Sequence, residues 1–283
     1  MIKFLDRKEI DETKWNAFVA KHPSGLPYAY SWYLDAVASK WNAFVLNDYE
    51  AIMPHPVAKK YGISYVYQPP MCQQLGVFAL EKDGMIFEEF YAKLNRRYLV
   101  YHICQNAFFT SKMQLLHRTN FELNLNRSLQ EILERYNTNT KRNIAKAEKQ
   151  KLQFSEKISI EEYLKFAEKH SNFPVSQIEK LARVLNECSL LFLCVVHDEQ
   201  NEINAANLCI KTANRIIHLV PVTAKNGRKN GAMHFLLHNI IRAFSEQDFV
   251  LDFEGSMIEG IAQFYRSFGA EEMFFYEKKR FVR

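Results

Sequence analysis

One order of helices and strands, predicted twice along the chain, constrains the fold more than any other feature of the sequence. In the N-terminal half, apolar spacing predicts helices over residues 12–21 and 31–40, followed by strands over 43–46, 50–57 and 63–68. A further helix and strand follow. Such alternation is typical of layered structures in which helices pack on a sheet. The sequence therefore predicts a mixed α/β fold.

The C-terminal half repeats this order without obvious sequence identity to the first half. Two helices precede three strands that are predicted over 190–197, 203–212 and 215–220. A helix with a broad apolar stripe is expected over 230–244, and the last strand over 272–279. The repeated order predicts two similar units in tandem.

The boundary between the two units is expected near a change in pattern after residue 125. Ser128 and Glu131 have the spacing of a capping box, which predicts the start of one long helix that reaches about Lys149. We therefore assign residues 1–125 to an N-terminal domain and 126–283 to a C-terminal domain.

Composition and charge indicate an ordinary globular protein. Of the 283 residues, 48% are hydrophobic and 24% are charged, and a net charge of +5 would suit an anionic partner without requiring one. The five cysteines form no C-x-x-C pair, and the charged N-terminus lacks the apolar stretch of a signal peptide. No apolar run approaches the ~18 residues of a membrane span. We expect a soluble, cytoplasmic protein with no membrane span.

A glycine-containing, cationic segment precedes the apolar helix of the second half. Free backbone N–H groups at a helix start favour an anion such as a pyrophosphate. The alternative is a polar turn in which Asn230 caps the helix. If the segment binds a cofactor, its contacts are expected from Arg228, Lys229, Asn230, Gly231, Ala232 and Met233.

Two acids and one tyrosine are the candidate catalytic residues. Asp252 and Glu254 lie two residues apart at the end of an apolar strand, so both would point to one face. One of them would accept a proton if burial raised its pKa, whereas the alternative pairs Asp252 with an arginine or lysine and leaves Glu254 in water. Tyr265 lies off the apolar pair Phe264 and Phe268, so its phenol either faces a cleft or lies at the surface.

The sequence predicts no metal site. His234 and His238 have the spacing of two zinc ligands on one helix, but no glutamate base lies between them and no third ligand is near. Packed or solvent-facing histidines are the simpler interpretation.

These features together resemble the GNAT N-acyltransferase family. The loop pattern of that family, R/Q-x-x-G-x-G/A, is matched by Arg228 and Gly231, while Met233 replaces the last small residue. Tyr265 and Gly269 match a later Tyr-x-x-x-Gly pattern. The segments around residues 68–78, 139–149 and 251–270 resemble, more specifically, the FemAB-like branch, whose members have two GNAT-like domains in tandem.

The resemblance implies transfer of an acyl group from acyl-CoA, with acetyl-CoA as the expected donor, to a small-molecule or peptide amine. It also implies that the C-terminal domain binds the donor and catalyses, and that the N-terminal domain shapes the acceptor side without catalysing. The pyrophosphate would lie on the segment from Lys229 to Met233, and Tyr265 would protonate the leaving thiolate. The weaker alternative follows the Fem ligases, which transfer an amino acid from aminoacyl-tRNA to a cell-wall precursor. Basic residues of 141–151 would then contact tRNA phosphates, or they form a solvated helix end. A third alternative is a GNAT-like binding protein without catalysis. The sequence does not determine the oligomeric state.

Overall fold

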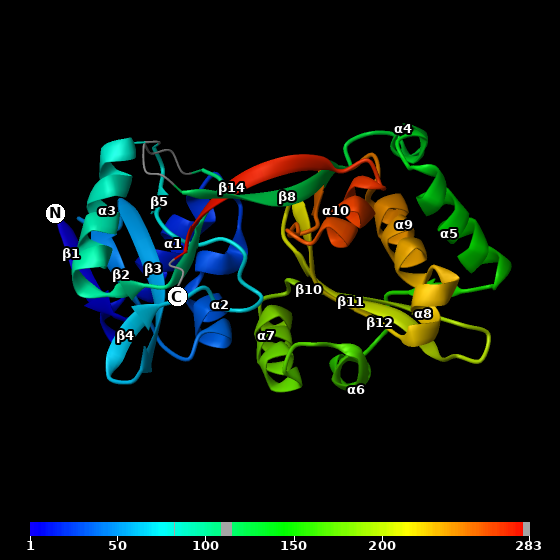
Figure 1. The fold of residues 1–283 in the computed structure, drawn as a ribbon, viewed down its shortest axis with the longest axis horizontal. Coiled ribbons are helices and arrows are strands. Elements are labelled where there is room, and N and C mark those ends of the chain that lie inside the picture. Colours follow the sequence, from blue (N-terminus) through cyan, green and yellow to red (C-terminus); the bar gives the residue numbers. More distant parts are fainter. Residues whose placement is uncertain (82, 109–114, 280–283) are drawn as a thin grey trace. The chain divides into compact units, whose positions relative to one another are not determined.

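A computed structural model describes residues 1–81, 83–108 and 115–279. The chain forms two compact units (Figure 1). Unit 1 comprises Met1–Arg118 and Phe274–Arg283, and unit 2 comprises Thr119–Met273. The elements confirm the expected mixed α/β architecture with two tandem units.

The two units divide the chain differently from the boundary expected after residue 125. The first crossing falls within strand β8 (Leu116–Asn124), and a second falls within the last strand, β14 (Glu271–Lys279). From Tyr276 onward, β14 pairs antiparallel with β7 (His102–Gln105) of unit 1. Unit 1 is therefore built from two separate parts of the chain, which a local sequence pattern cannot reveal.

Unit 1 contains the helices and strands predicted for the N-terminal half, together with short additions. Its elements are β1 (Ile2–Asp6), α1 (Glu12–Lys21), α2 (Ser31–Val37), β2 (Trp41–Leu46), β3 (Ala51–Lys60), β4 (Ile63–Val66), β5 (Phe78–Ala79), α3 (Gly84–Arg97), β6 (Leu99–Val100) and β7, with 3-10 turns at Arg7–Glu9 and Pro27–Ala29.

The sheet of unit 1 has the order β1-β2-β3-β4-β6, and β5 also pairs with β3. All pairs in it are antiparallel except β4 with β6. Helix α3 buries Phe87, Phe90, Tyr91 and Leu94, a spacing that places one apolar face toward the sheet. This face closes the core of unit 1.

The elements of unit 2 are those predicted for the C-terminal half, except that one predicted helix is divided in two and that a short strand and a short helix are added. They are α4 (Leu129–Glu134), α5 (Thr138–Lys149), β9 (Gln153–Ser155), α6 (Ile160–His170), α7 (Val175–Glu187), β10 (Leu191–His197), β11 (Ile203–Lys211), β12 (Arg215–Thr223), α8 (Lys225–Asn230), α9 (Ala232–Phe244), β13 (Val250–Asp252) and α10 (Glu259–Arg266).

Helices cover both faces of the unit 2 sheet. The strand order is β8-β13-β12-β11-β10-β9, and only β12 and β13 run parallel. Helix α9 packs on β10 and β11 and is itself covered by α5, whereas α6 and α7 lie on the opposite face (Figure 1). The sheet is therefore the middle of three layers.

The long helix expected from Ser128 to Lys149 is wrong, because it is two helices. The capping box of Ser128 and Glu131 starts α4 as expected, but α4 ends at Glu134. The Asn137 side chain then accepts the N–H of Thr140 and caps α5. An asparagine that can cap a new helix competes with continued helix, and here the cap prevails.

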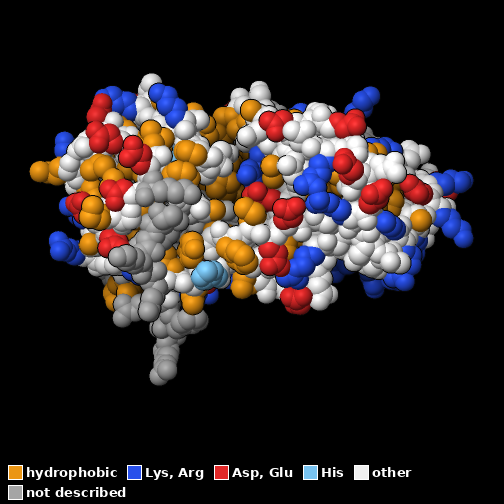
Figure 2. Space-filling view, turned by 90° about the horizontal axis from the view of Figure 1, so that it is seen from above, with side chains coloured by type: hydrophobic (Ala, Val, Ile, Leu, Met, Phe, Trp, Pro, Cys, Tyr) orange, Lys and Arg blue, Asp and Glu red, His pale blue; other side chains and the backbone are white. Residues whose placement is uncertain are grey.

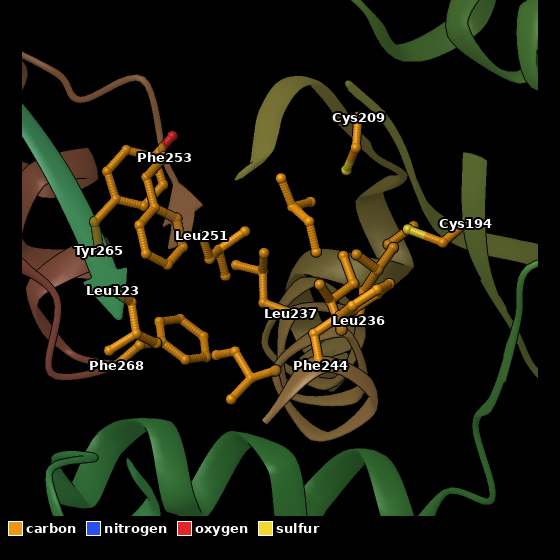
Figure 3. Packing of buried hydrophobic residues seen from close by; sticks show 14 of the residues in the cluster. Leu123, Cys194, Cys209, Leu236, Leu237, Phe244, Leu251, Phe253, Tyr265 and Phe268 are labelled. Atoms are coloured by element: carbon orange, nitrogen blue, oxygen red, sulfur yellow. The ribbon is translucent and has the colours of Figure 1, made fainter. Parts of the chain in front are cut away.

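The core of unit 2 joins α9 to the sheet and to α10. Leu236, Leu237, Ile240 and Ile241 are fully buried along one side of α9. Figure 3 shows Leu236 and Leu237 within a cluster that extends to Phe268 of the α10 end. The apolar stripe that predicted this helix is therefore the centre of the unit 2 core.

No helix among the described residues is both long enough and apolar enough to cross a membrane.

A buried histidine in unit 1 has an incompletely satisfied ring. His55 of β3 is fully buried beside Phe4, Phe44 and Tyr98. Its Nδ1 lies 3.1 Å from the Met53 carbonyl oxygen, and its Nε2 has no partner among the described residues. Burial lowers the pKa of His55 to about 4. Protonation of this ring is therefore unfavourable in the folded protein.

We predict that His55 makes unit 1 sensitive to acid. Because the folded pKa lies below the unfolded value of 6.5, this histidine's contribution is present above pH 6.5 and is lost as the pH falls toward 4. At pH 5, His55→Phe should gain roughly 2 kcal/mol in unfolding free energy relative to its own effect at pH 8. Urea unfolding at both pH values measures this. The exposed His117, replaced in the same way, is the control, and an equal gain there would contradict the assignment.

Candidate functional site

Strands β12 and β13 separate soon after they pair. Their parallel pairing covers only Arg215–Ile217 against Val250–Asp252, and β12 then continues to Thr223 paired with β11 alone. A cavity of about 420 Å³ opens along this part of β12, which we call its free part because its β13 side has no strand partner among the described residues. Its volume is within the range of small-molecule sites.

Four segments of unit 2 line this cavity, which we call the β12 cavity. They are the turn after α6, the free part of β12, the junction of α8 with α9, and one face of α10. The lining residues are His170, Ser171, Asn172, Phe173, His218, Pro221, Thr223, Gly227, Arg228, Gly231, Met233, His234, Ile261, Phe264 and Tyr265.

The predicted phosphate loop is partly helical. Residues Lys225–Asn230 form the short helix α8, and α9 starts after Gly231. Gly231 has φ +79°, and a Cβ there would lie 2.5 Å from the Asn143 carbonyl oxygen. Only glycine fits this close approach of α5 with this backbone conformation. The glycine thus permits a sharp turn that points the first turn of α9 at the cavity wall.

The six residues predicted to bind a cofactor do not line one common cavity. Arg228, Gly231 and Met233 line the β12 cavity. Lys229 and Asn230 instead line a second cavity of about 330 Å³, together with residues of α5 and of the β10–β11 turn. Ala232 is fully buried and lines neither cavity. A helix turns successive residues to different sides, which explains this division.

The side chain of Asn230 stabilises the junction of α8 with α9 through two hydrogen bonds. Its side-chain amide donates to Asn204 Oδ1 at 2.8 Å, and its Oδ1 accepts the Ala232 N–H at 3.2 Å. The alternative role expected for Asn230, a cap of the apolar helix, is thus close to what the structure shows. The N–H groups of Met233 and His234 follow in the first turn of α9, and no side chain of the described residues accepts a hydrogen bond from them.

Tyr265 lies at the edge of the core and lines the β12 cavity. Its ring stacks on Phe253, with centroids 4.8 Å apart, and Figure 3 shows its oxygen pointing away from Leu123 and Phe268. Burial, followed by the charges of Glu254 and Asp252, raises the pKa of Tyr265 above its usual value. The phenol therefore stays protonated at physiological pH and can donate a hydrogen bond.

Asp252 is part of a buried ion-pair network and does not line the cavity. Its Oδ2 accepts from Arg215 at 2.7 Å, and its Oδ1 accepts from the Asn120 amide and the Glu254 N–H. Arg215 also contacts Glu122 at 2.7 Å. Both Asp252 oxygens are therefore occupied, which favours the alternative that paired this residue with an arginine.

Glu254 lies just beyond the strand, with φ +56° and a half-buried side chain. It is absent from the lining of the β12 cavity, although its charge contributes to the raised pKa of Tyr265. Of the three predicted catalytic residues, only Tyr265 borders the cavity.

His218 is a cavity residue that the sequence analysis missed. It is almost completely buried on β12, its ring meets that of Tyr265 edge to face, and its Nδ1 lies 2.7 Å from Asn207 Nδ2. Burial lowers the pKa of His218 to about 3, so the ring is neutral at physiological pH. A single histidine among the apolar residues of this strand was the available signal.

Comparison with solved structures identifies the fold. FemX aligns over 97% of this chain and 96% of its own, with a TM-score of 0.64 and 11% identity. L-PGS from Bacillus licheniformis aligns over 96% and 92%, with 0.60 and 14%. A tandem GNAT protein from the clavulanic acid biosynthesis pathway, solved without AcCoA, aligns over 100% of both chains, with 0.53 and 11%. The chain has a tandem GNAT-like fold.

Sequence comparison adds nothing to this result, since no protein-family model and no curated protein matches the chain. The GNAT-like fold is thus recognised from its three-dimensional arrangement. The β12 cavity lies in the GNAT-like unit 2, where β12 and β13 separate.

We predict that Asp252 and Glu254 differ in their effect on stability. Asp252→Asn leaves the buried Arg215 with Glu122 alone and should lower the unfolding free energy of unit 2 by about 3 kcal/mol. Glu254→Gln keeps the size of a half-buried side chain and its hydrogen-bonding capacity, so it should cost less than about 1 kcal/mol. Urea unfolding followed by circular dichroism compares the two variants. Similar losses would show that the network does not depend on Asp252.

Proposed function

We propose that unit 2 transfers an acyl group from acyl-CoA to an amine. The observation that carries this proposal is that one cavity is lined both by the start of α9 and by Tyr265. The first supplies backbone amides suited to a phosphate group, and the second supplies a protonated phenol. Donor binding and leaving-group stabilisation, which the predicted chemistry requires, would therefore both take place in the β12 cavity. The similarity of the fold to a tandem GNAT protein supports this choice.

The donor would bind along the free part of β12. Its pyrophosphate would approach Arg228 and the amides of Met233 and His234, where the helix dipole also favours negative charge. Met233, which replaces a small residue of the GNAT pattern, is half-buried and borders the cavity as well as packing on the core. Its flexible side chain narrows the space beside the Gly231 turn.

The acyl transfer itself requires little of the protein beyond positioning. The amine nitrogen attacks the thioester carbon, the carbon–sulfur bond breaks, and the proton lost by the amine finally resides on the CoA thiol. Tyr265, kept protonated by its burial, would donate to the departing sulfur and be reprotonated from the amine. His218, neutral and held by Asn207, would form the adjoining wall without repelling a positively charged acceptor.

A second candidate function, transfer from aminoacyl-tRNA, is favoured by the surface of α5. Lys141, Arg142, Lys146 and Lys149 are all exposed on this helix. Lys151, by contrast, pairs with Glu199 at 2.8 Å. On the face shown in Figure 2, acidic and basic side chains are interleaved, so the view shows no continuous basic surface of the kind that a phosphate backbone would follow. We therefore place acyl-CoA first.

Two neighbouring cations provide a test of the donor site. Arg228 lines the β12 cavity, whereas Lys229 lines the second cavity. Replacing either residue by glutamine removes one positive charge, so Lys229→Gln is a control for the loss of charge alone. We expect acetyl-CoA to bind the wild-type protein in isothermal titration calorimetry, Arg228→Gln to weaken binding roughly ten-fold, and Lys229→Gln to change it by less than about two-fold.

The same titrations distinguish the two donors. No binding of acetyl-CoA or of longer acyl-CoAs would contradict the first proposal. Binding of charged tRNA with a steep dependence on salt would then favour the second.

Tyr265→Phe tests the catalytic role. It removes only the phenolic oxygen and should lower kcat for acyl transfer roughly 100-fold while leaving the acetyl-CoA Kd within about two-fold. Tyr136→Phe is a matched control, because Tyr136 is also buried in unit 2 but does not border the cavity. Initial rates with a panel of amines measure both variants. Equal rates for wild type and Tyr265→Phe would remove the assignment of Tyr265 as proton donor.

A further inference from the structure

Three potential metal ligands come together in unit 1, and none of them lines the β12 cavity. His102 and Cys104 are two residues apart on β7, so their side chains leave the same face of the strand. Glu277 of β14 pairs directly with Cys104 in the antiparallel register. Strand pairing thus brings a carboxylate next to a thiol and an imidazole from a position 175 residues away from His102.

The donor atoms of these side chains converge on one point. His102 Nε2 lies 2.9 Å from Glu277 Oε2 and 3.5 Å from Cys104 Sγ, and all three donor atoms lie within 4.8 Å of one another. Bond lengths to zinc of about 2.0–2.1 Å for nitrogen and 2.3 Å for sulfur place these two atoms about 3.5 Å apart at a tetrahedral angle, which is the separation found here. An oxygen about 2.0–2.2 Å from zinc would lie about 3.4 Å from the nitrogen, so the nitrogen–oxygen pair needs to open by about 0.5 Å.

The same geometry argues against a nucleophilic cysteine. In a cysteine–histidine–acid triad, the thiol and the acid contact opposite nitrogens of the imidazole ring. Here both contact the same atom, Nε2. Cys104 is also almost completely buried, which disfavours attack on a substrate. Convergence on one nitrogen is the arrangement of a ligand set.

We propose that His102, Cys104 and Glu277 bind one divalent transition-metal ion of zinc-like character. A thiolate together with an imidazole selects a borderline-soft ion over magnesium or calcium. Binding forms a metal–sulfur bond and releases the thiol proton to solvent. Water would complete the tetrahedron, because His102 is partly exposed while Cys104 and Glu277 are buried.

The surrounding charges are compatible with this ion. Arg118 Nε lies 3.6 Å from Glu277 Oε2, and Lys279 pairs in register with His102. In the complex, one thiolate and one carboxylate balance the two charges of the ion. Arg118 would then contact the carboxylate from outside the metal site, a position in which such groups orient a ligand. The ion would tie β14 to β7, and so tie the C-terminal strand into unit 1.

Cobalt provides the direct test, because a thiolate bound to Co²⁺ gives a charge-transfer absorption in the near ultraviolet. We expect the full chain, treated with chelator and then titrated with Co²⁺, to develop this band with one equivalent and to lose it when Zn²⁺ is added. Cys104→Ser should abolish the band. Cys72→Ser, which changes another buried cysteine of unit 1, is the matched control and should retain it.

Two further variants keep the proposal open to contradiction if Cys104→Ser fails to fold. His102→Gln and Glu277→Gln should each weaken Zn²⁺ binding by at least about ten-fold in competition with a chromogenic chelator, with unchanged far-ultraviolet circular dichroism. Three outcomes would overturn the proposal: no band in the wild type, a band that persists in Cys104→Ser, or unchanged zinc affinity in both other variants.

Discussion

The short parallel pairing of β12 with β13 is the constraint on which the candidate site depends. The strands pair at only three positions, and Arg215 at this end contacts both Asp252 and Glu122, so that one guanidinium joins β12, β13 and β8. Burial, and then the charge of Asp252, raises the pKa of Glu122. Because removing one partner of a buried ion pair leaves an uncompensated charge, this network tolerates little rearrangement. Beyond it β12 has no strand beside it on the β13 side, and this separation opens the cavity that Tyr265 and the start of α9 border.

Elements with strong local signals were predictable from the sequence. Helix α1 begins and ends at the residues expected from its apolar spacing. The capping box of Ser128 and Glu131 was also read correctly. For the site, Tyr265 and Gly231 were singled out by their match to the GNAT patterns, since local pattern left a surface tyrosine and a polar turn as open alternatives. Each of these predictions rested on residues within one or two turns of a helix.

Features that depend on distant residues were not predictable in this way. Whether Asp252 faces solvent, substrate or Arg215 depends on three strands, and only the folded sheet brings Arg215 close. His218 gave no motif because its neighbours in the cavity come from α6, α8 and α10. The group of His102, Cys104 and Glu277 requires strand pairing between the middle and the end of the chain. The helix break at Asn137 was a local choice between a continued helix and a newly capped one, and spacing alone did not decide it.

The return of β14 to unit 1 has a consequence for how the protein is made. A ribosome releases the residues of unit 1 up to Arg118 before those of unit 2, and the part of β14 that pairs with β7 emerges after unit 2. The strands from β8 to β13 of the unit 2 sheet all precede Phe274, so they can pair before the part of β14 beyond Phe274 is made. Strand β7 of unit 1 lacks its partner β14 until then. Unit 1 is therefore translated before unit 2 but completes its folding after it.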